Sequence, residues 1–319
     1  MYPAKKICVI VPIRNVYPEF KSCLESLSDL NYNNFDIIVV NDNEVSEFKI
    51  DLDIQDKNKI KILYSSGKGP SYARNLAAKS TDADFLAFTD SDCIVDKNWL
   101  IELFRGFEEK PYAVACGGIQ KSPTDATSFE KKVFLFMQRV GFITDYIRLS
   151  GREDILEVAH NASCCALYKK DIFLKEGGFL EGLWPGEDVE LDCRLRKKGY
   201  KLVFNPAAIV YHHRPKNLKS FSRMMYKYGE AIGILTKMYG FFRKIQILPL
   251  LFIFSIVLFA LTFLSNFLIP ILMAAGIILF IFLAYVRFDL YIFFLCCTAF
   301  LLWNIGFMGS IIAKNKPVK

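Results

Sequence analysis

The stretch Phe85-Leu86-Ala87-Phe88-Thr89-Asp90-Ser91-Asp92-Cys93 decides how this chain is organised. Four apolar residues that end abruptly in polar ones are typical of a short strand covered on both faces, as in parallel sheets with helices above and below. Ligands of such sheets bind beyond the carboxyl ends of the strands. Two carboxylates at positions i and i+2 can point toward one hard cation, which takes oxygen ligands and commonly keeps substrate phosphates as others. The pattern therefore predicts a site for a metal ion and a nucleoside diphosphate.

The same acidic pair has an ordinary structural alternative. Asp and Ser are common turn residues, and Asp90 and Asp92 also fit an Asx turn with solvated carboxylates. The pattern alone does not separate the two interpretations, so the rest of the chain must decide between them.

The C-terminal part of the chain is unusually apolar. The 319 residues are 53% hydrophobic, and residues 245–313 contain only two charged side chains, Arg287 and Asp289. A membrane-spanning helix needs about 20 apolar residues. We therefore expect about three spanning helices over 245–313, with breaks near Ser265-Asn266 and at Arg287-Phe288-Asp289.

The N-terminal part is expected to stay in the cytoplasm. Its first apolar run, residues 7–11, ends at Pro12 and is too short for the core of a signal peptide. The nine cysteines contain no Cys-x-x-Cys pair and their number is odd. These features indicate reduced, mostly buried thiols.

Basic residues gather just before the apolar region. Residues 201–244 carry nine Lys or Arg against Glu230 alone, and basic groups near a cytoplasmic leaflet each gain about 1 kcal/mol from anionic lipid. The expected partner of this region is thus a membrane and not nucleic acid. Apolar residues recur there at steps of three and four: Leu218, Phe221, Met225, Tyr228, Ile232, Leu235, Tyr239 and Phe242. This stripe predicts an amphipathic helix at the membrane interface, with packing against the preceding domain as the alternative.

Strands and helices alternate with short connections along the first half of the chain. The expected elements are a strand at 7–11, a helix at 18–30, strands at 35–40 and 61–64, a helix after 67–75, the strand at 85–88, a helix at 98–107, a strand at 113–116 and a helix at 129–147. Such alternation indicates a right-handed, mostly parallel α/β sheet. Asn15, Asp42 and the acidic pair then gather at the carboxyl ends of its strands.

The glycine-rich residues 67–75 lead into a helix and can cradle a phosphate at its N-terminus. They lack the spacing of a Walker loop. Arg74 lies in the first turns of that helix. It can reach a diphosphate, or it can simply pair with Asp82 or Asp84.

A second acidic group follows Trp184-Pro185-Gly186. Glu187 and Asp188 begin a helix there, where acids complement the helix dipole. A carboxylate in that position can also serve as a general base if a proton donor comes within hydrogen-bond reach. Further along, His212 and His213 lie together, as a surface turn or as ligands of a divalent ion.

In order and spacing, these residues resemble the family 2 glycosyltransferases of the GT-A fold across residues 6–215. The matching positions are Pro12 and Asn15, Asn41-Asp42, Gly69 with Ala73-Arg74-Asn75, Asp90-Ser91-Asp92, Asn161 before a strand that ends in Lys169-Lys170, Gly177-Gly178-Phe179, Gly186-Glu187-Asp188 and His212. The resemblance implies an α/β nucleotide-sugar-binding domain that is followed by an all-α transmembrane segment.

The resemblance also implies roles on the donor side. Asp42 contacts the base of a nucleoside diphosphate sugar, and Asp90 contacts its ribose or the metal-bound diphosphate. Asp92 and His212 coordinate Mg²⁺ or Mn²⁺, with His213 as an alternative to His212. The remaining positions implied to bind the nucleotide sugar are Pro12, Asn15 and Arg74.

On the acceptor side, the resemblance implies that Asp188 is the general base that deprotonates an acceptor hydroxyl. Glu187 then orients the base or the acceptor, and Asn161 lies toward the acceptor. A divalent ion can stabilise the leaving diphosphate, so a single displacement inverts the anomeric centre without a covalent intermediate.

The chain departs from the family pattern in two places. Asn41 stands where an Asp is frequent, which leaves the base preference open. The Gln-x-x-Arg-Trp motif of processive cellulose and chitin synthases is missing, and residues 223–228 are the nearest stretch. Synthesis of a long polymer is therefore not expected.

The predicted organisation is a catalytic domain at 1–215, a basic amphipathic helix at 216–244, about three membrane helices at 245–313 and a basic tail at 314–319. The protein is expected in the cell membrane, as a multi-pass protein with its catalytic domain on the cytoplasmic side. Three spans place the lysines of the tail outside, against the positive-inside tendency. The conflict disappears if one of the apolar segments is re-entrant. It also disappears if the short tail does not determine the topology.

Three functions fit the sequence. The first is a membrane-bound inverting glycosyltransferase that uses a UDP or GDP sugar and extends a lipid-linked glycan. The second is a polyprenyl-phosphate sugar synthase, in which the phosphate is the nucleophile and Asp188 is needed less as a base. The third is a catalytically silent membrane scaffold of a glycan-assembly complex.

Overall fold

The computed structural model describes residues 5–15, 18–43, 60–140, 154–262, 282, 284–285 and 287–313, with side chains left out for 258–262. The chain divides into two compact units. The first consists of Met1–Asp125, Asp145–His213 and Lys316–Lys319, and the second of Ala126–Thr144 and Arg214–Asn315. Each unit is described by itself.

The first unit is built on a nine-stranded sheet with the order β3-β2-β1-β4-β8-β6-β9-β5, in which β7 also pairs with β9. The strands are β1 Ile7–Ile13, β2 Phe35–Asn41, β3 Ile60–Tyr64, β4 Phe85–Phe88, β5 Cys93–Val95, β6 Ala113–Lys121, β7 Leu156–Val158, β8 Ala166–Lys169 and β9 Lys201–His212. The half from β3 to β4 is parallel, as predicted. The other half is mixed, because β8 runs antiparallel to both β4 and β6.

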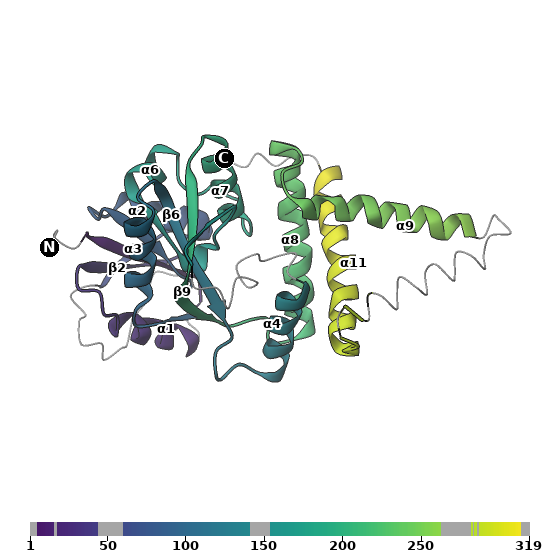
Figure 1. Ribbon diagram of the computed structural model, residues 1–319, viewed down its shortest axis with the longest axis horizontal. Helices are drawn as coiled ribbons and strands as arrows, with labels where there is room; N and C mark the ends of the chain where they lie inside the picture. Colours follow the sequence, from purple (N-terminus) through teal and green to yellow (C-terminus); the bar gives the residue numbers. More distant parts are fainter. Residues whose placement is uncertain are drawn as a thin grey trace. The chain divides into compact units, whose positions relative to one another are not determined.

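Helices cover both faces of this sheet (Figure 1). On one face lie α1 (Pro18–Ser28) and α3 (Trp99–Glu109), and on the other α2 (Pro70–Lys79), α6 (Lys170–Lys175) and α7 (Glu187–Lys197). Successive residues of a strand point to opposite faces. In β4, Phe85 and Ala87 belong to the first core, while Leu86 and Phe88 belong to the second. The prediction of a strand buried on both faces is confirmed.

The second unit contains α4 (Ser128–Val140), α8 (Leu218–Tyr239), the 3₁₀ turn η3 (Lys244–Ile247), α9 (Leu248–Thr262) and α11 (Leu290–Ile312). The helix predicted at 129–147 corresponds to α4, and residues 141–147 lie outside the described part. The predicted amphipathic helix corresponds to α8. Its buried residues include Phe221, Met225, Ile232 and Leu235 of the predicted stripe.

Glycines allow α8 and α11 to approach closely. A Cβ atom added to Gly229 would lie 1.9 Å from the carbonyl oxygen of Trp303, and one added to Gly306 would lie 2.1 Å from that of Tyr226. Backbone contact through small residues is typical of helix pairs in membranes. The α8 and α11 interface therefore depends on the lack of a side chain at these positions.

Within the described residues, α11 is long and apolar enough to cross a membrane. A second candidate arises if Leu218–Tyr239 and Lys244–Val257, which meet at 97°, count as one bent span. The break predicted at Arg287-Phe288-Asp289 is present, since Arg287 and Phe288 have positive φ and Asp289 caps α11. Apart from residues 282 and 284–285, the middle of the three predicted spans falls outside the described part. The number of spans and their orientation stay predictions.

Candidate active site

Asp42 follows the last residue of β2 and lies beside the end of β1. Its backbone N–H donates to the carbonyl of Ile13 over 2.7 Å, so the two strand ends lie side by side. The carboxylate is buried and accepts hydrogen bonds from the Ser65 hydroxyl at 2.5 Å and from the Gly69 N–H at 2.9 Å. The glycine-rich loop thus folds around Asp42. Of the other donor-side positions on β1, Pro12 is buried in the strand and Asn15 is exposed just after it.

Arg74 links the two acidic groups. Its guanidinium on α2 is 2% exposed and donates to Asp90 Oδ1 at 2.6 Å and to Glu187 Oε1 at 2.8 Å. Asp82 and Asp84, the alternative partners in the sequence, bond to Lys6. Burial opposes the charge, but the two carboxylates outweigh it and raise the pKa of Arg74 above its ordinary value. The bridge fixes the end of β4 to the start of α7.

Asp90, Asp92 and His212 offer three ligand atoms that lie within 4.8 Å of one another. β5 pairs antiparallel with β9 and sets Cys93 opposite His212. This register brings His212 Nε2 to 3.4 Å from Asp92 Oδ1. The Nε2 atom of His213 instead lies 3.7 Å from Asp125 Oδ1. Two carboxylates and an imidazole suit Mg²⁺ or Mn²⁺, so the donor set fits the expected ion.

Gln120 orients the imidazole and was not recognised in the sequence. It is buried in β6, and its Oε1 lies 3.1 Å from His212 Nδ1. A proton on Nδ1 then donates to Gln120 and leaves the Nε2 lone pair toward Asp92. One signal was available, since Gln120 is a polar residue near the end of a strand that is otherwise buried and apolar.

Glu187 and Asp188 begin α7 after Gly186, which adopts a left-handed conformation with φ of 101°. Asp188 Oδ2 accepts from the backbone N–H of Ser163 at 3.1 Å, and Oδ1 accepts from the Val189 N–H at 2.8 Å. The Asp188 carboxylate keeps 17% exposure, whereas that of Glu187 keeps 4%. Of the two side chains, Asp188 is the more accessible to solvent.

The environment of Glu187 shifts its proton affinity. Burial and the neighbouring Asp188 carboxylate raise the pKa of Glu187 to about 7, against the attraction of Arg74. Three carboxylates, those of Asp90, Glu187 and Asp188, surround this one guanidinium, so they are not all neutralised by it. With a pKa of about 7, the Glu187 carboxyl changes its charge around neutral pH.

Asn161 is part of a buried network around Asp192. Its N–H donates to Asp192 Oδ2 at 2.7 Å, and its side-chain amide donates to the carbonyl of Val203 at 3.1 Å. Tyr168 and His160 contact the same carboxylate. These contacts fix the turn before β8, which carries Ser163 to Asp188. The acceptor-side role of Asn161 stays a prediction.

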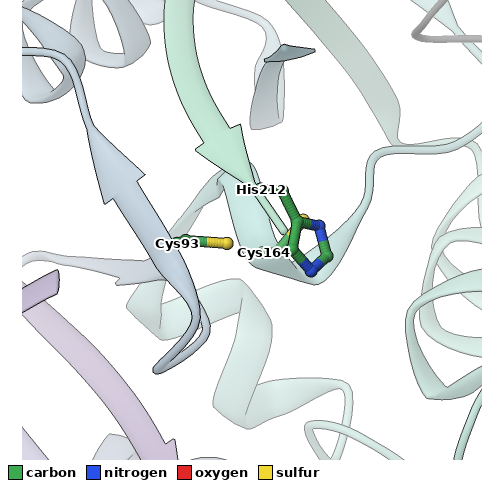
Figure 2. Close-up of side chains that lie close together, drawn as sticks. All are labelled: Cys93, Cys164 and His212. Carbon is green, nitrogen blue, oxygen red and sulfur yellow. The ribbon is translucent and has the colours of Figure 1, made fainter. Parts of the chain in front are cut away.

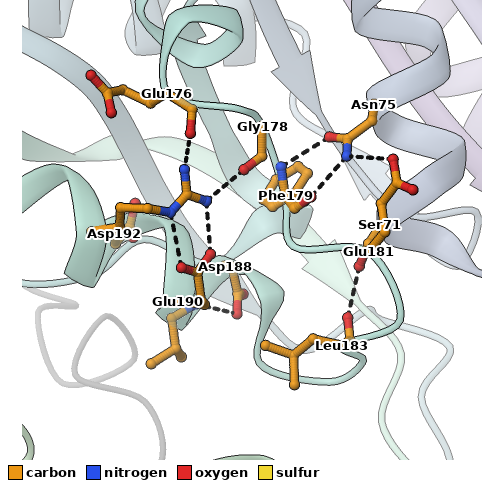
Figure 3. A network of polar contacts seen from close by, with 12 residues as sticks. Ser71, Asn75, Glu176, Gly178, Phe179, Glu181, Leu183, Asp188, Glu190 and Asp192 are labelled. Atoms are coloured by element: carbon orange, nitrogen blue, oxygen red, sulfur yellow. Dashed lines mark hydrogen bonds and ion pairs between the residues drawn. The ribbon is translucent and has the colours of Figure 1, made fainter. Parts of the chain in front are cut away.

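The loop between α6 and α7 is fastened to α2 (Figure 3). The Asn75 side chain donates to the carbonyl of Phe179 at 2.8 Å and accepts from its N–H at 2.9 Å. Gly178, with φ of 69°, passes so close that a Cβ atom would lie 2.4 Å from Asn75 Oδ1. Ser71 bonds to the carbonyl of Leu183 further along the loop. α2 therefore positions the chain that leads to Glu187 and Asp188.

Two known proteins with similar sequences are named as transferases of sugars. The chain is 26% identical over 236 residues to a pre-mycofactocin glycosyltransferase of Mycobacterium tuberculosis, which covers 72% of this chain and 47% of the relative. It is 22% identical over 261 residues to a dolichyl N-acetyl-alpha-D-glucosaminyl phosphate 3-beta-D-2,3-diacetamido-2,3-dideoxy-beta-D-glucuronosyltransferase of Methanococcus voltae, over 78% of this chain and 79% of the relative. The chain thus spans about half the length of the first of these relatives.

A solved structure supports the fold. The mannosyltransferase PcManGT of Pyrobaculum calidifontis, solved in complex with GDP-Man and Mn²⁺, superimposes with a TM-score of 0.62 at 14% identity and covers 95% of this chain and 88% of its own. The family model for glycosyl transferase family 2 matches residues 8–177, just over half of the chain. The chain therefore belongs to glycosyl transferase family 2 and has a GT-A fold.

Proposed function

We propose that this protein is a membrane-bound, metal-dependent inverting glycosyltransferase that moves a sugar from a UDP or GDP sugar to a hydroxyl of a lipid-linked glycan. The observation that carries this proposal is the convergence of Asp90, Asp92 and His212 on one point, joined through Arg74 to the start of α7. The cluster of Asp90, Asp92 and His212 suits a diphosphate donor, and the start of α7 suits an acceptor hydroxyl.

On the donor side, Asp90, Asp92 and His212 would hold Mg²⁺ or Mn²⁺. Such an ion stabilises the negative charge that grows on the leaving diphosphate. Asp42 would bind the base, in the loop that Ser65 and Gly69 close around it. Pro12, Asn15 and Arg74 complete the proposed donor site. Arg74 acts mainly by holding Asp90 in place, since its own guanidinium is buried between two carboxylates.

On the acceptor side, Asp188 would take the proton of the attacking hydroxyl. The Ser163 N–H holds one carboxylate oxygen at 3.1 Å and orients the group. Glu187, which is buried behind it and bonded to Arg74, positions the start of α7. A positioned general base contributes about 10²- to 10⁴-fold to such a reaction.

The acceptor is proposed from the membrane part and from one relative. α9 and α11 expose many large apolar side chains, so an acceptor with a lipid chain would be found where these helices insert. The relative from Methanococcus voltae is named for a dolichyl-phosphate-linked acceptor. A cell-membrane location, with the first unit in the cytoplasm, is part of the same proposal.

The test uses the full chain in detergent with Mn²⁺, a panel of UDP and GDP sugars, and either a polyprenyl-linked glycan or polyprenyl phosphate. Asp188→Asn should lower transfer to the glycan by about 10²-fold or more. Asp171→Asn is the matched control, because Asp171 also lies in the first turn of a helix, α6, and it should leave transfer unchanged.

Three results would contradict the proposal. Transfer to polyprenyl phosphate alone, with full activity in Asp188→Asn, would favour the polyprenyl-phosphate sugar synthase. No turnover of any donor with either acceptor would favour the silent scaffold. Retention of the donor's anomeric configuration in the product would exclude a single inverting displacement.

A further inference from the structure

Two thiols lie beside the imidazole of His212. Cys93, at the start of β5, pairs with His212 of β9, and Cys164 lies in the 3₁₀ turn η2 (Ser163–Cys165) before β8. The two sulfur atoms and a ring nitrogen all lie within 4.8 Å of one another. Figure 2 shows the three side chains gathered from these separate segments.

We propose that Cys93, Cys164 and His212 form a second metal site, one for a thiophilic divalent cation such as Zn²⁺. The site shares His212 with the proposed Mg²⁺ or Mn²⁺ site of Asp90 and Asp92. Occupation of the thiol site puts the imidazole proton on Nε2 and removes that lone pair from the hard-ion site, so the two ions bind antagonistically.

The ligand set and its spacing fit this class of ion. Zn²⁺ prefers sulfur and nitrogen in a tetrahedral arrangement, and its usual bond lengths set such ligands about 3.5 Å apart. Cys164 Sγ lies 3.7 Å from His212 Nδ1. Cys93 is fully buried and Cys164 is 4% exposed. Binding releases the two thiol protons and leaves a fourth position for water.

The two nitrogens of the ring face different sites. Nδ1 lies toward Cys164 and Gln120, whereas Nε2 lies 3.4 Å from Asp92 Oδ1. A neutral imidazole has one N–H and one lone pair. When Nδ1 donates to Gln120, the Nε2 lone pair serves the hard ion. When Nδ1 coordinates a thiophilic ion, Nε2 carries the proton and donates to Asp92 instead.

The thiol site stands apart from the proposed function, since it rests on three side chains and their spacing. Its antagonism rests on the proposed function, since it needs the hard-ion site at Asp90, Asp92 and His212. Two experiments separate these parts.

The first experiment adds Co²⁺ to the full chain in detergent under a non-thiol reductant. Wild type should show thiolate-to-cobalt charge-transfer absorption at one equivalent, and Cys93→Ser and Cys164→Ser should each lose it. Cys165→Ser is the matched control, a neighbouring buried thiol whose sulfur accepts from Trp99 Nε1; a serine hydroxyl can accept in its place. Asp92→Asn should also keep the absorption.

Absence of this absorption in wild type would overturn the thiol site. Absorption of equal strength in Cys164→Ser would overturn it as well, because the thiolates would then lie elsewhere. The spectrum requires no sugar donor, so a failure of the proposed function does not affect it.

The second experiment measures Mn²⁺ binding by electron paramagnetic resonance, with and without one equivalent of Zn²⁺. In wild type, Zn²⁺ should weaken Mn²⁺ binding by about tenfold or more, the scale of coupled sites that share a ligand. In Cys164→Ser, one equivalent should have little effect. Equal weakening in both proteins would mean that Zn²⁺ acts at the carboxylates, and unweakened binding in wild type would overturn the antagonism.

Discussion

The two units of this protein place their polar and apolar groups in opposite ways. The α/β unit buries charge: Arg74 is 2% exposed between Asp90 and Glu187. The helical unit joins α8 to α11 through backbone contact at glycines and exposes large apolar side chains along α9 and α11. Buried charge fixes ligand-binding groups precisely, whereas an exposed apolar surface suits lipid. We therefore assign the proposed chemistry to the first unit and the proposed membrane attachment to the second.

Removal of the buried cation Arg74 should lower the free energy of unfolding more than any other change considered for the two units. Arg74→Met leaves Asp90 and Glu187 without their common partner, and the loss of one partner from a buried ion pair costs about 3–5 kcal/mol. Denaturant titration measures the loss in the free energy of unfolding, and hydrogen exchange in the peptides of α2 and α7 locates it. Lys201→Met is the control, because its pair with Glu157 is exposed. Equal destabilisation by both substitutions would show that the buried bridge has no special role.

The pH dependence of stability tests the buried carboxyl. The pKa of Glu187 in the folded protein is about 7, above its ordinary value of 4.5. Between these values the unfolded chain has released a proton that the folded protein keeps, so the free energy of unfolding falls as the pH rises from about 4.5 to 7. Glu187→Gln should remove a fall on the order of 3 kcal/mol. The same slope in wild type and variant, measured by denaturant titration at several pH values, would contradict this assignment.

A methyl group at Gly229 should disturb the packing of α8 against α11. In Gly229→Ala the new Cβ would lie 1.9 Å from the Trp303 carbonyl oxygen, and overpacking of this kind costs roughly 1–3 kcal/mol. Gly309→Ala is the matched control on α11, because its Cβ would lie 3.7 Å from the nearest atom. That variant should gain up to about 1 kcal/mol from helix propensity.

The measurement is the thermal midpoint in detergent, together with hydrogen exchange in α8 and α11. If Gly229→Ala and Gly309→Ala change stability alike, close backbone contact does not hold the pair together. Unaltered exchange in the α/β unit is expected for both.

The smallest expected effect is that of removing a helix cap. Two asparagines at helix starts, one in each unit, allow the comparison. Asn217 caps α8 by accepting from the Ser220 N–H at 2.9 Å, whereas Asn98 begins α3 without a side-chain cap. Asn217→Ala should destabilise α8 by about 1 kcal/mol. Asn98→Ala should cost less, since it loses only an exposed bond to Asn31. Hydrogen exchange in the first turn of each helix distinguishes them, and a reversed order would rule out capping as the cause.

Local patterns in the sequence predicted much of the fold. The run of residues 85–88 that ends at Asp90 and Asp92 gave the buried strand and the acidic pair, because a strand covered on both faces needs consecutive apolar residues. The parallel half of the sheet followed from the alternation of strands and helices. The mixed half did not, since the placement of β8 between β4 and β6 depends on pairing between distant segments.

The same distinction applies to the candidate site. Single residues such as Asp42, Asp92 and Asp188 carried recognisable patterns. The choice of His212 over His213 beside Asp92 required the register of β5 on β9. Gln120 and Ser163 were missed because strand pairing and a turn bring them to the site. The polar Gln120 in a buried strand was a local signal, but it did not indicate His212 as the partner. α4 was expected as a helix, but its packing in the second unit has no local signal.

The most direct test of the account is the Mn²⁺ dependence of donor turnover in wild type and Asp92→Ala. Wild type should lose hydrolysis or transfer of its UDP or GDP sugar on chelation and regain it with Mn²⁺. Asp92→Ala should lack Mn²⁺-dependent turnover while hydrogen exchange in α8 and α11 stays as in wild type. Normal Mn²⁺-dependent turnover in Asp92→Ala would contradict the proposed metal site and, with it, the division of work between the two units.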